Sequence, residues 1–109
     1  MKEFISEKDL ALGRMSSGRL YLELTTSVGW EGFPSYAEAL VKFLSGAVVS
    51  RNDSADTRVW VVVVEGILLW LVYDDLPVMI SFEAKSDEGD RFLQRLNDDL
   101  FTSINVFGG

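Results

Sequence analysis

Two uninterrupted apolar blocks, residues 59–64 and 67–72, dominate the hydropathy pattern of this chain, and only Glu65 and Gly66 separate them. Both blocks are rich in β-branched and aromatic residues, which favour strands. A Glu-Gly break between two such blocks predicts a hairpin, because glycine accepts the positive φ of a tight primed turn. With Glu65 and Gly66 in the turn, Val64 pairs with Ile67 and Trp60 with Leu71.

Alternation along the two strands divides the hairpin side chains between two faces. One face is formed by six apolar residues: Trp60, Val62, Val64, Ile67, Leu69 and Leu71. The opposite face is formed by six others, which we take as the candidate partner interface: Val59, Val61, Val63, Leu68, Trp70 and Val72. The pattern leaves open which face is covered, so either Trp60 or Trp70 lies on the open side.

The flanking segments 20–25 and 78–84 alternate between apolar and polar residues, which predicts strands buried on one side only. Their polar sides, with Tyr21, Glu23, Ser81 and Glu83, are expected to form a wet rim around the apolar centre of the sheet. Residues 74–77, Asp-Asp-Leu-Pro, are typical of a turn. A short strand is predicted at 47–49. Residues 1–17 are the least clear part of the pattern, with either a strand or a short helix that ends at the Ser-Ser-Gly turn.

Two helices are predicted from amphipathic spacing and end signals. The first follows Ser35, three residues before Glu38 in a capping-box spacing, with Pro34 as an alternative first helical residue and Gly46 as its C-terminal cap. The second follows Ser86 as N-cap, and leucines recur along it at helical spacing. These elements predict an α+β domain: a mainly antiparallel four- to five-stranded sheet with two helices packed on one face.

The length of 109 residues suits one domain over residues 1–109, with 105–109 as a C-terminal tail. The chain has no Cys and no His, which excludes disulfides, thiolate nucleophiles, Cys/His zinc sites and imidazole catalysis. The formal net charge of −7 disfavours nucleic-acid binding. The N-terminus does not resemble a secretory signal, so we expect a cytoplasmic protein.

A membrane span is a poor interpretation of the apolar blocks. Residues 59–72 make a fourteen-residue segment with Glu65 at its centre, whereas a spanning helix needs about 20 apolar residues. We therefore expect neither membrane nor nucleic-acid partners.

Aromatic, proline and glycine positions give the chain a family resemblance. "WEGFPSYAEAL", then "ADTRVW", "VEG" and "ISFEA" resemble a family of small bacterial single-domain proteins of unknown function, over roughly residues 30–100. The markers are a Trp-x-x-Phe-Pro-x-Tyr-Ala helix start, an Ala-Asp-x-x-x-Trp strand and the Glu-Gly hairpin. The resemblance implies a bacterial cytoplasmic protein and brings no activity, cofactor or catalytic residue.

Candidate chemistry is sparse. Asp53 and Asp56 lack the glycine and terminal glutamate of a calcium loop, and a solvated turn is the favoured interpretation. The adjacent pairs at 74–75 and 98–99 do not form a paired-carboxylate site. We therefore predict no catalytic residue, no metal and no cofactor.

A second candidate set of contact residues lies around the start of the first helix: Trp30, Phe33 and Tyr36. They form either a contact loop for a partner or the packed entry to that helix, and packing is the favoured interpretation.

The open hairpin face is the more specific signal. Full burial of six apolar side chains contributes about 9–18 kcal/mol, which is comparable to the stability of a whole domain. Residues 1–17, a second helical layer or a second copy of the chain would each cover such a face. We therefore predict a non-enzymatic interaction domain that forms a homodimer through this face, with an acidic immunity- or inhibitor-type protein that binds a basic enzyme as the alternative. A carboxylate enzyme with a divalent metal is a third, weaker hypothesis.

Overall fold

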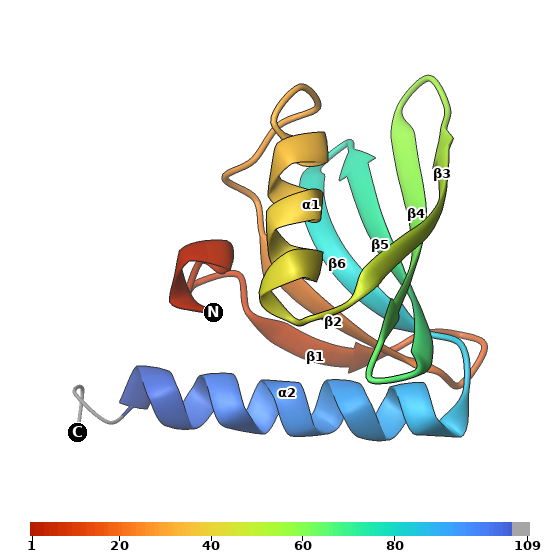
Figure 1. Cartoon of the computed structure of the whole chain (residues 1–109). Helices are drawn as coiled ribbons and strands as arrows, with labels where there is room; N and C mark the ends of the chain where they lie inside the picture. The colour runs from red at the N-terminus through yellow and green to blue at the C-terminus, as the bar shows by residue number, and fades with distance from the viewer. Residues whose placement is uncertain (106–109) are drawn as a thin grey trace.

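The structure is a computed structural model that describes residues 1–105 (Figure 1). Its elements follow in the order η1 (Lys2–Phe4), β1 (Ala11–Arg14), β2 (Leu20–Thr25), α1 (Phe33–Phe43), β3 (Ala47–Asp53), β4 (Thr57–Val64), β5 (Ile67–Asp75), β6 (Val78–Ala84) and α2 (Asp87–Asn105). Of the tail predicted at 105–109, residue 105 ends α2 and residues 106–109 lie outside the described part of the chain.

One antiparallel sheet joins all the strands in the order β1-β2-β6-β5-β4-β3 (Figure 1). The predicted α+β class and antiparallel sheet are confirmed, but the sheet has six strands, so four to five was too few. The additional strand is β1, a four-residue segment that pairs only with β2. The strand β3 is also longer than predicted, because its polar second half still pairs with β4.

The central hairpin has the predicted register, with Val64 opposite Ile67 and Trp60 opposite Leu71. Both turn residues take positive φ, 54° at Glu65 and 75° at Gly66, as a primed turn requires. The next turn is tighter than predicted. Because β5 continues to Asp75 and β6 begins at Val78, only residues 76 and 77 connect the two strands.

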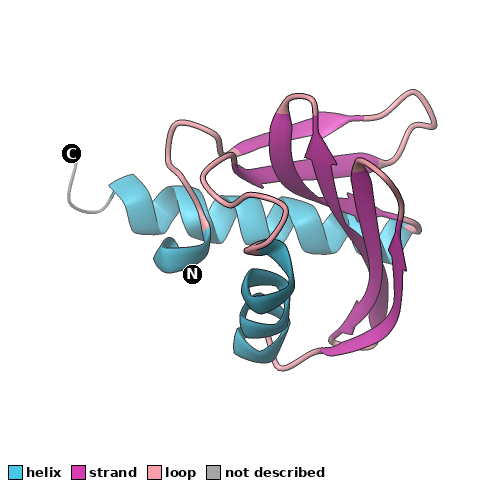
Figure 2. Cartoon of the chain, turned by 90° about the horizontal axis from the view of Figure 1, so that it is seen from above, coloured by secondary structure: helices cyan, strands magenta, loops and turns pink. Residues whose placement is uncertain are grey.

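The two helices cover one face of the curved sheet, called here the inner face (Figures 1 and 2). Strand residues such as Trp60 and Phe82 share one core cluster with Leu40 of α1 and Leu93 of α2. The N-terminal segment joins the same cluster through Phe4 and Leu12. Within residues 1–105, no helix and no N-terminal segment covers the opposite face, called the outer face (Figure 2).

The ends of the two helices show which of the predicted cap residues are used. The helix α1 begins at Phe33, earlier than the Ser35 cap implies, with Gly32 as N-cap and Pro34 in its first turn. At its other end Ser45 takes the left-handed conformation, φ 57°, which was expected of Gly46. Gly46 is instead required by space, since a Cβ there would lie 2.5 Å from the Val63 carbonyl oxygen. Ser86 caps α2 as predicted, because its Oγ accepts a bond from the Gly89 amide at 3.0 Å.

Candidate functional site

The outer face carries the six residues predicted as the partner interface, called here the hairpin patch: Val59, Val61, Val63, Leu68, Trp70 and Val72. Cross-strand pairing fixes their neighbours, with Trp70 between Val61 and Glu83. Leu68 is 44% exposed, whereas Val72 is enclosed by its neighbours at 5%. The patch is therefore a continuous apolar surface two strands wide.

The two hairpin tryptophans have opposite environments, which answers the question that the sequence left open. Trp60 is 2% exposed, and its ring lies 5.2 Å from that of Phe33 in an edge-to-face contact. Trp70 lies on the outer face and is half-buried. The Lys85 ammonium is 3.7 Å from its ring centroid and also pairs with Glu83 at 3.3 Å.

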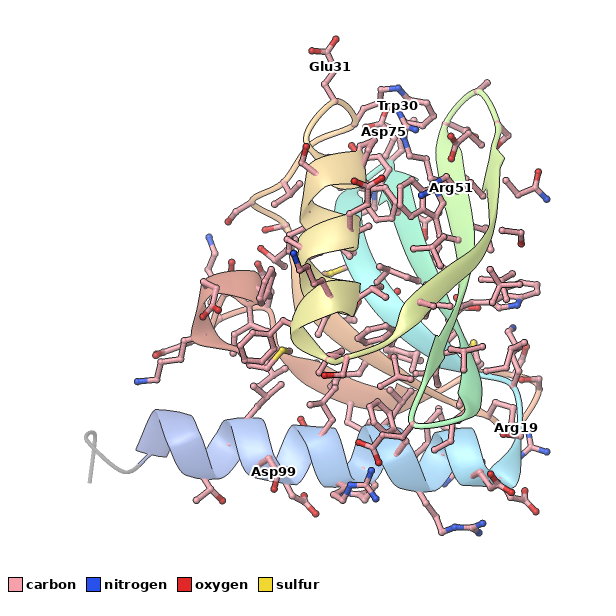
Figure 3. The ribbon with its side chains drawn as sticks, in the orientation of Figure 1. Arg19, Trp30, Glu31, Arg51, Asp75 and Asp99 are labelled. Carbon is pink, nitrogen blue, oxygen red and sulfur yellow. The ribbon has the colours of Figure 1, made fainter. Side chains whose placement is uncertain are left out.

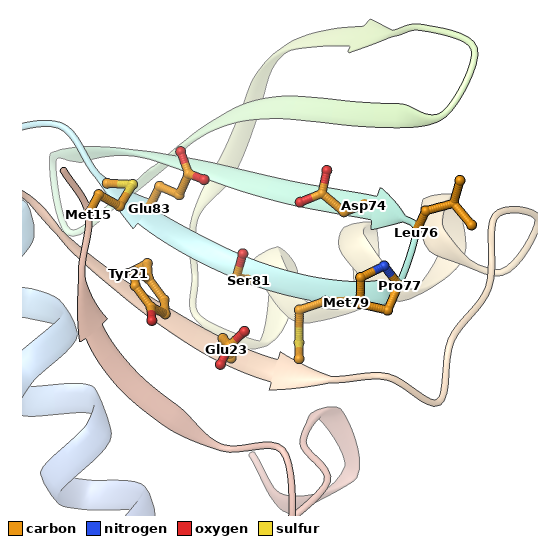
Figure 4. Close-up of a pocket in the computed structure, with 9 residues that line it drawn as sticks. All are labelled: Met15, Tyr21, Glu23, Asp74, Leu76, Pro77, Met79, Ser81 and Glu83. Carbon is orange, nitrogen blue, oxygen red and sulfur yellow. The ribbon is translucent and has the colours of Figure 1, made fainter. Parts of the chain in front are cut away.

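Next to the hairpin patch, the outer face becomes polar over β2 and β6. The predicted rim residues Tyr21, Glu23, Ser81 and Glu83 all lie here, in two directly paired rows. They border a shallow pocket of about 300 Å³ that sequence reasoning missed (Figure 4). This pocket, called here the acidic pocket, is lined by nine residues: Met15, Tyr21, Glu23, Asp74, Leu76, Pro77, Met79, Ser81 and Glu83.

The aromatic loop residues do not meet in a free cavity. Phe33 is fully buried, and its ring lies 5.7 Å from that of Tyr73. The Tyr36 hydroxyl donates a hydrogen bond of 2.6 Å to the Phe4 carbonyl oxygen, and burial raises the pKa of Tyr36. Trp30, labelled in Figure 3, is half-buried. Its ring lies edge-to-face against that of Tyr73. These contacts agree with a packed entry to α1.

Trp30 also belongs to a group of stacked charged and aromatic side chains at one end of the sheet. The Arg58 guanidinium lies 3.9 Å from the Trp30 ring centroid and pairs with Asp53 at 2.9 Å. Asp53 also accepts a bond of 3.2 Å from the Trp60 indole nitrogen. This carboxylate, considered above as a metal ligand, therefore serves to orient an arginine and a tryptophan.

The remaining candidate carboxylates stay apart. Asp74 lies on the outer face, whereas Asp75 accepts a bond of 2.8 Å from the Tyr73 hydroxyl. Burial, together with this hydrogen bond, raises the pKa of Tyr73. Asp98 and Asp99 are exposed on α2. Across residues 1–105, no group of three or more acidic residues is arranged to hold a metal ion.

Among residues 1–105, no helix is both long and apolar enough to cross a membrane.

Comparison with known proteins gives a family without an assigned activity. No curated protein and no solved structure matches the chain. A family model described as "Protein of unknown function (DUF3630)" matches residues 10–98. The matched region contains every strand of the sheet, the hairpin patch and the acidic pocket. Because the match covers most of its length, the chain belongs to this family of proteins of unknown function.

Proposed function

We propose that the chain is a non-enzymatic protein-interaction domain that binds a second copy of itself through the hairpin patch. The observation that carries this proposal is the row of apolar side chains on the outer face of β4 and β5, where Leu68 is exposed, Val72 is buried and the other four are half-buried. Contiguous apolar surface of this kind is uncommon on a monomer and typical of interaction sites. The helices and the N-terminal segment, which are the intramolecular candidates among residues 1–105, lie on the inner face.

The distribution of charge supports a second copy as the occupant. Two carboxylates of the outer face, Glu23 on β2 and Glu83 on β6, lie to one side of the hairpin patch. The other side is formed by β3, whose outward positions include Ser50 and Asn52. A two-fold axis parallel to the strands would place the β6 side of one copy over the β3 side of the other. Apolar centres then meet while the two sets of carboxylates stay apart.

The solution mass tests this proposal. Sedimentation at micromolar concentration is expected to give about twice 12.2 kDa for the wild-type chain. Val61→Lys places a charge at the centre of the patch and is expected to give a monomer with an unchanged fold. Phe43→Lys, at a 52% exposed apolar position on α1, is the matched control and is expected to remain dimeric. A monomeric wild-type chain, or equal dissociation by both variants, would reject the proposal.

A second candidate function is an inhibitor-type protein that binds a basic enzyme. The acidic pocket beside the hairpin patch favours it, together with the net charge of −7, because both would steer a cationic partner. Co-expression with the product of an adjacent gene, followed by binding measurements at increasing salt, tests this function. An affinity that does not fall as salt rises would count against it.

A further inference from the structure

We propose that the acidic pocket binds an organic cation: a guanidinium or primary ammonium group carried on an apolar stem. Three of its lining residues are carboxylates, Glu23, Asp74 and Glu83, and none is Lys or Arg (Figure 4). This site is distinct from the hairpin patch and does not depend on the proposed self-association. Two independent features, an unpaired hydroxyl and a set of incompletely paired carboxylates, support it.

The hydroxyl belongs to Ser81, at the centre of the pocket lining (Figure 4). Ser81 is only 8% exposed, yet none of the described residues forms a hydrogen bond with its Oγ. The hydroxyl is accessible from the pocket, where water or a ligand can pair with it. Since Ser81 lines the pocket, an entering group is its natural partner. A cationic N–H donor would use an oxygen lone pair of this hydroxyl.

The carboxylates surround this hydroxyl. Glu23 is directly opposite Ser81 across the β2–β6 pair. Glu83 follows Ser81 by two residues on β6 and is the diagonal neighbour of Glu23, a separation of about 7–8 Å between backbone positions. Lys85 partly neutralises Glu83 at 3.3 Å. Among residues 1–105, Glu23 and Asp74 have no ion-pair partner. The pocket therefore holds uncompensated negative charge.

The spacing of these groups selects the kind of cation. A metal ion needs oxygens that converge within about 2.0–2.6 Å of one point, and the described residues form no such group of three acids. A guanidinium is planar and spreads five donors around its edge, so it reaches acceptors that a metal ion does not. A primary ammonium on a flexible stem reaches the acceptors of the pocket one at a time.

The rest of the lining suits an apolar stem. Met79, Leu76 and Pro77 form the end of the pocket at the β5–β6 turn, and Leu76 is 89% exposed (Figure 4). The Tyr21 side chain reaches across Gly13 of β1, where any Cβ would overlap its ring. Gly13 thus allows the Tyr21 ring to border the pocket, where an aromatic face also attracts cations.

A titration with N-butylguanidinium, followed by amide chemical shifts, tests the inference. We expect saturable shifts in β2, in β6 and at residues 76–77, and none with N-butylurea, which has the same shape without the charge. Glu23→Gln is expected to weaken binding about tenfold, because it removes a charge-assisted hydrogen bond. Ser81→Ala is expected to weaken it about threefold.

Glu31→Gln is the matched control, because this exposed carboxylate points away from the body of the protein (Figure 3). It is expected to bind as the wild-type chain does. Equal binding of N-butylurea, equal weakening by Glu23→Gln and Glu31→Gln, or no shifts at millimolar ligand would overturn the inference. If Glu23→Gln loses its folded spectrum, Asp74→Asn replaces it, with the expectation of at least threefold weaker binding.

Two further arms identify the source of the cation and isolate the site. A blocked tripeptide with a central arginine that produces the same shifts points to a protein side chain, whereas binding of the small cation alone points to a free metabolite. The titration is repeated with Val61→Lys. Binding retained in this variant, when the wild-type chain proves monomeric, supports the pocket although the proposed self-association fails. If neither the wild-type chain nor the Val61→Lys variant binds the cation, the inference about the pocket is rejected and the proposed self-association is unaffected.

Discussion

The two faces of the central hairpin are equally apolar in sequence, and the fold treats them differently. On the inner face, Trp60 is enclosed by α1, whereas on the outer face Trp70 has the Lys85 ammonium over its ring. The difference comes from the neighbouring strands. Leu71 pairs with Phe82 and Trp70 with Glu83, so only the inner face continues as apolar surface across β6 and β2. The helices cover the face that is apolar over the whole sheet, and the other keeps a local apolar patch.

The largest test of this contrast is Trp60→Ala. Removing a fully enclosed aromatic side chain is expected to lower the free energy of unfolding by about 3–5 kcal/mol. Denaturant unfolding followed by circular dichroism measures the change. A loss below about 1 kcal/mol would mean that the inner face is not the stability core, because such a value is typical of a surface substitution.

Gly46→Ala tests how closely the covering helix is held against the sheet. The added Cβ would meet the Val63 carbonyl oxygen and the Val64 side chain, so we expect a loss of about 1–3 kcal/mol in unfolding free energy. The matched variant is Ser45→Gly, one residue earlier. Because Ser45 already has φ 57°, this change is expected to be neutral or stabilising. Equal losses in both variants would contradict the close approach of α1 to β4.

Trp70→Ala is the outer-face counterpart of Trp60→Ala. The side chain is half-buried and has solvent on one side, so we expect a loss of only about 1 kcal/mol in the stability of the isolated chain. Measuring it in the Val61→Lys background removes any contribution from self-association. A cost equal to that of Trp60→Ala would show that both faces are buried in the single chain.

The smallest expected effect is that of Asp90→Asn, at the start of α2. Asp90 accepts a bond of 2.9 Å from the Leu20 amide and pairs with Arg19 at 3.0 Å, which joins the helix to β2. The backbone hydrogen bond, followed by Arg19, lowers the Asp90 pKa below its ordinary value of 3.8. We expect Asp90→Asn to cost less than about 1 kcal/mol at pH 7, because the ion pair is partly solvated.

This small cost has a defined pH dependence. A folded-state pKa below the unfolded one means that the Asp90 carboxylate stabilises the fold above the unfolded pKa, and that this stabilisation is lost as pH falls through the folded pKa. The difference between the wild-type chain and Asp90→Asn is therefore expected to vanish in acid. Paired unfolding curves at pH 7 and below 3.8 measure it, and a difference that grows in acid would contradict the assignment.

Local signals carried most of the fold prediction. The primed turn and strict alternation fixed the β4–β5 register, and Ser86 marked the start of α2. The faces were left open because the pairing was not extended across the turn at residues 74–77. A turn of two residues places Leu71 beside Phe82, and a turn of four residues places it beside Ile80, so either length would have predicted that Trp60 is buried.

The acidic pocket was harder to predict than the hairpin patch. Tyr21, Glu23, Ser81 and Glu83 were predicted to share a polar rim, but their facing arrangement depends on the pairing of β2 with β6. About fifty residues of chain separate these strands, and no turn sets their register. The strand β1 was not predicted for a similar reason. Its Gly13 makes room for the Tyr21 ring of β2, and this requirement becomes visible only when the two strands are paired.

The irregular pairing of β3 also bears on aggregation through the edge of the sheet. This strand forms a free edge of the sheet, and its register shifts between Val48 and Ser50. A straight edge would offer another chain a continuous row of backbone donors and acceptors. This row would lie next to the apolar hairpin patch, which itself favours association. The shift interrupts that row and bends the strand. The face-to-face contact proposed for the hairpin patch is thus compatible with resistance to the strand-by-strand growth of fibres.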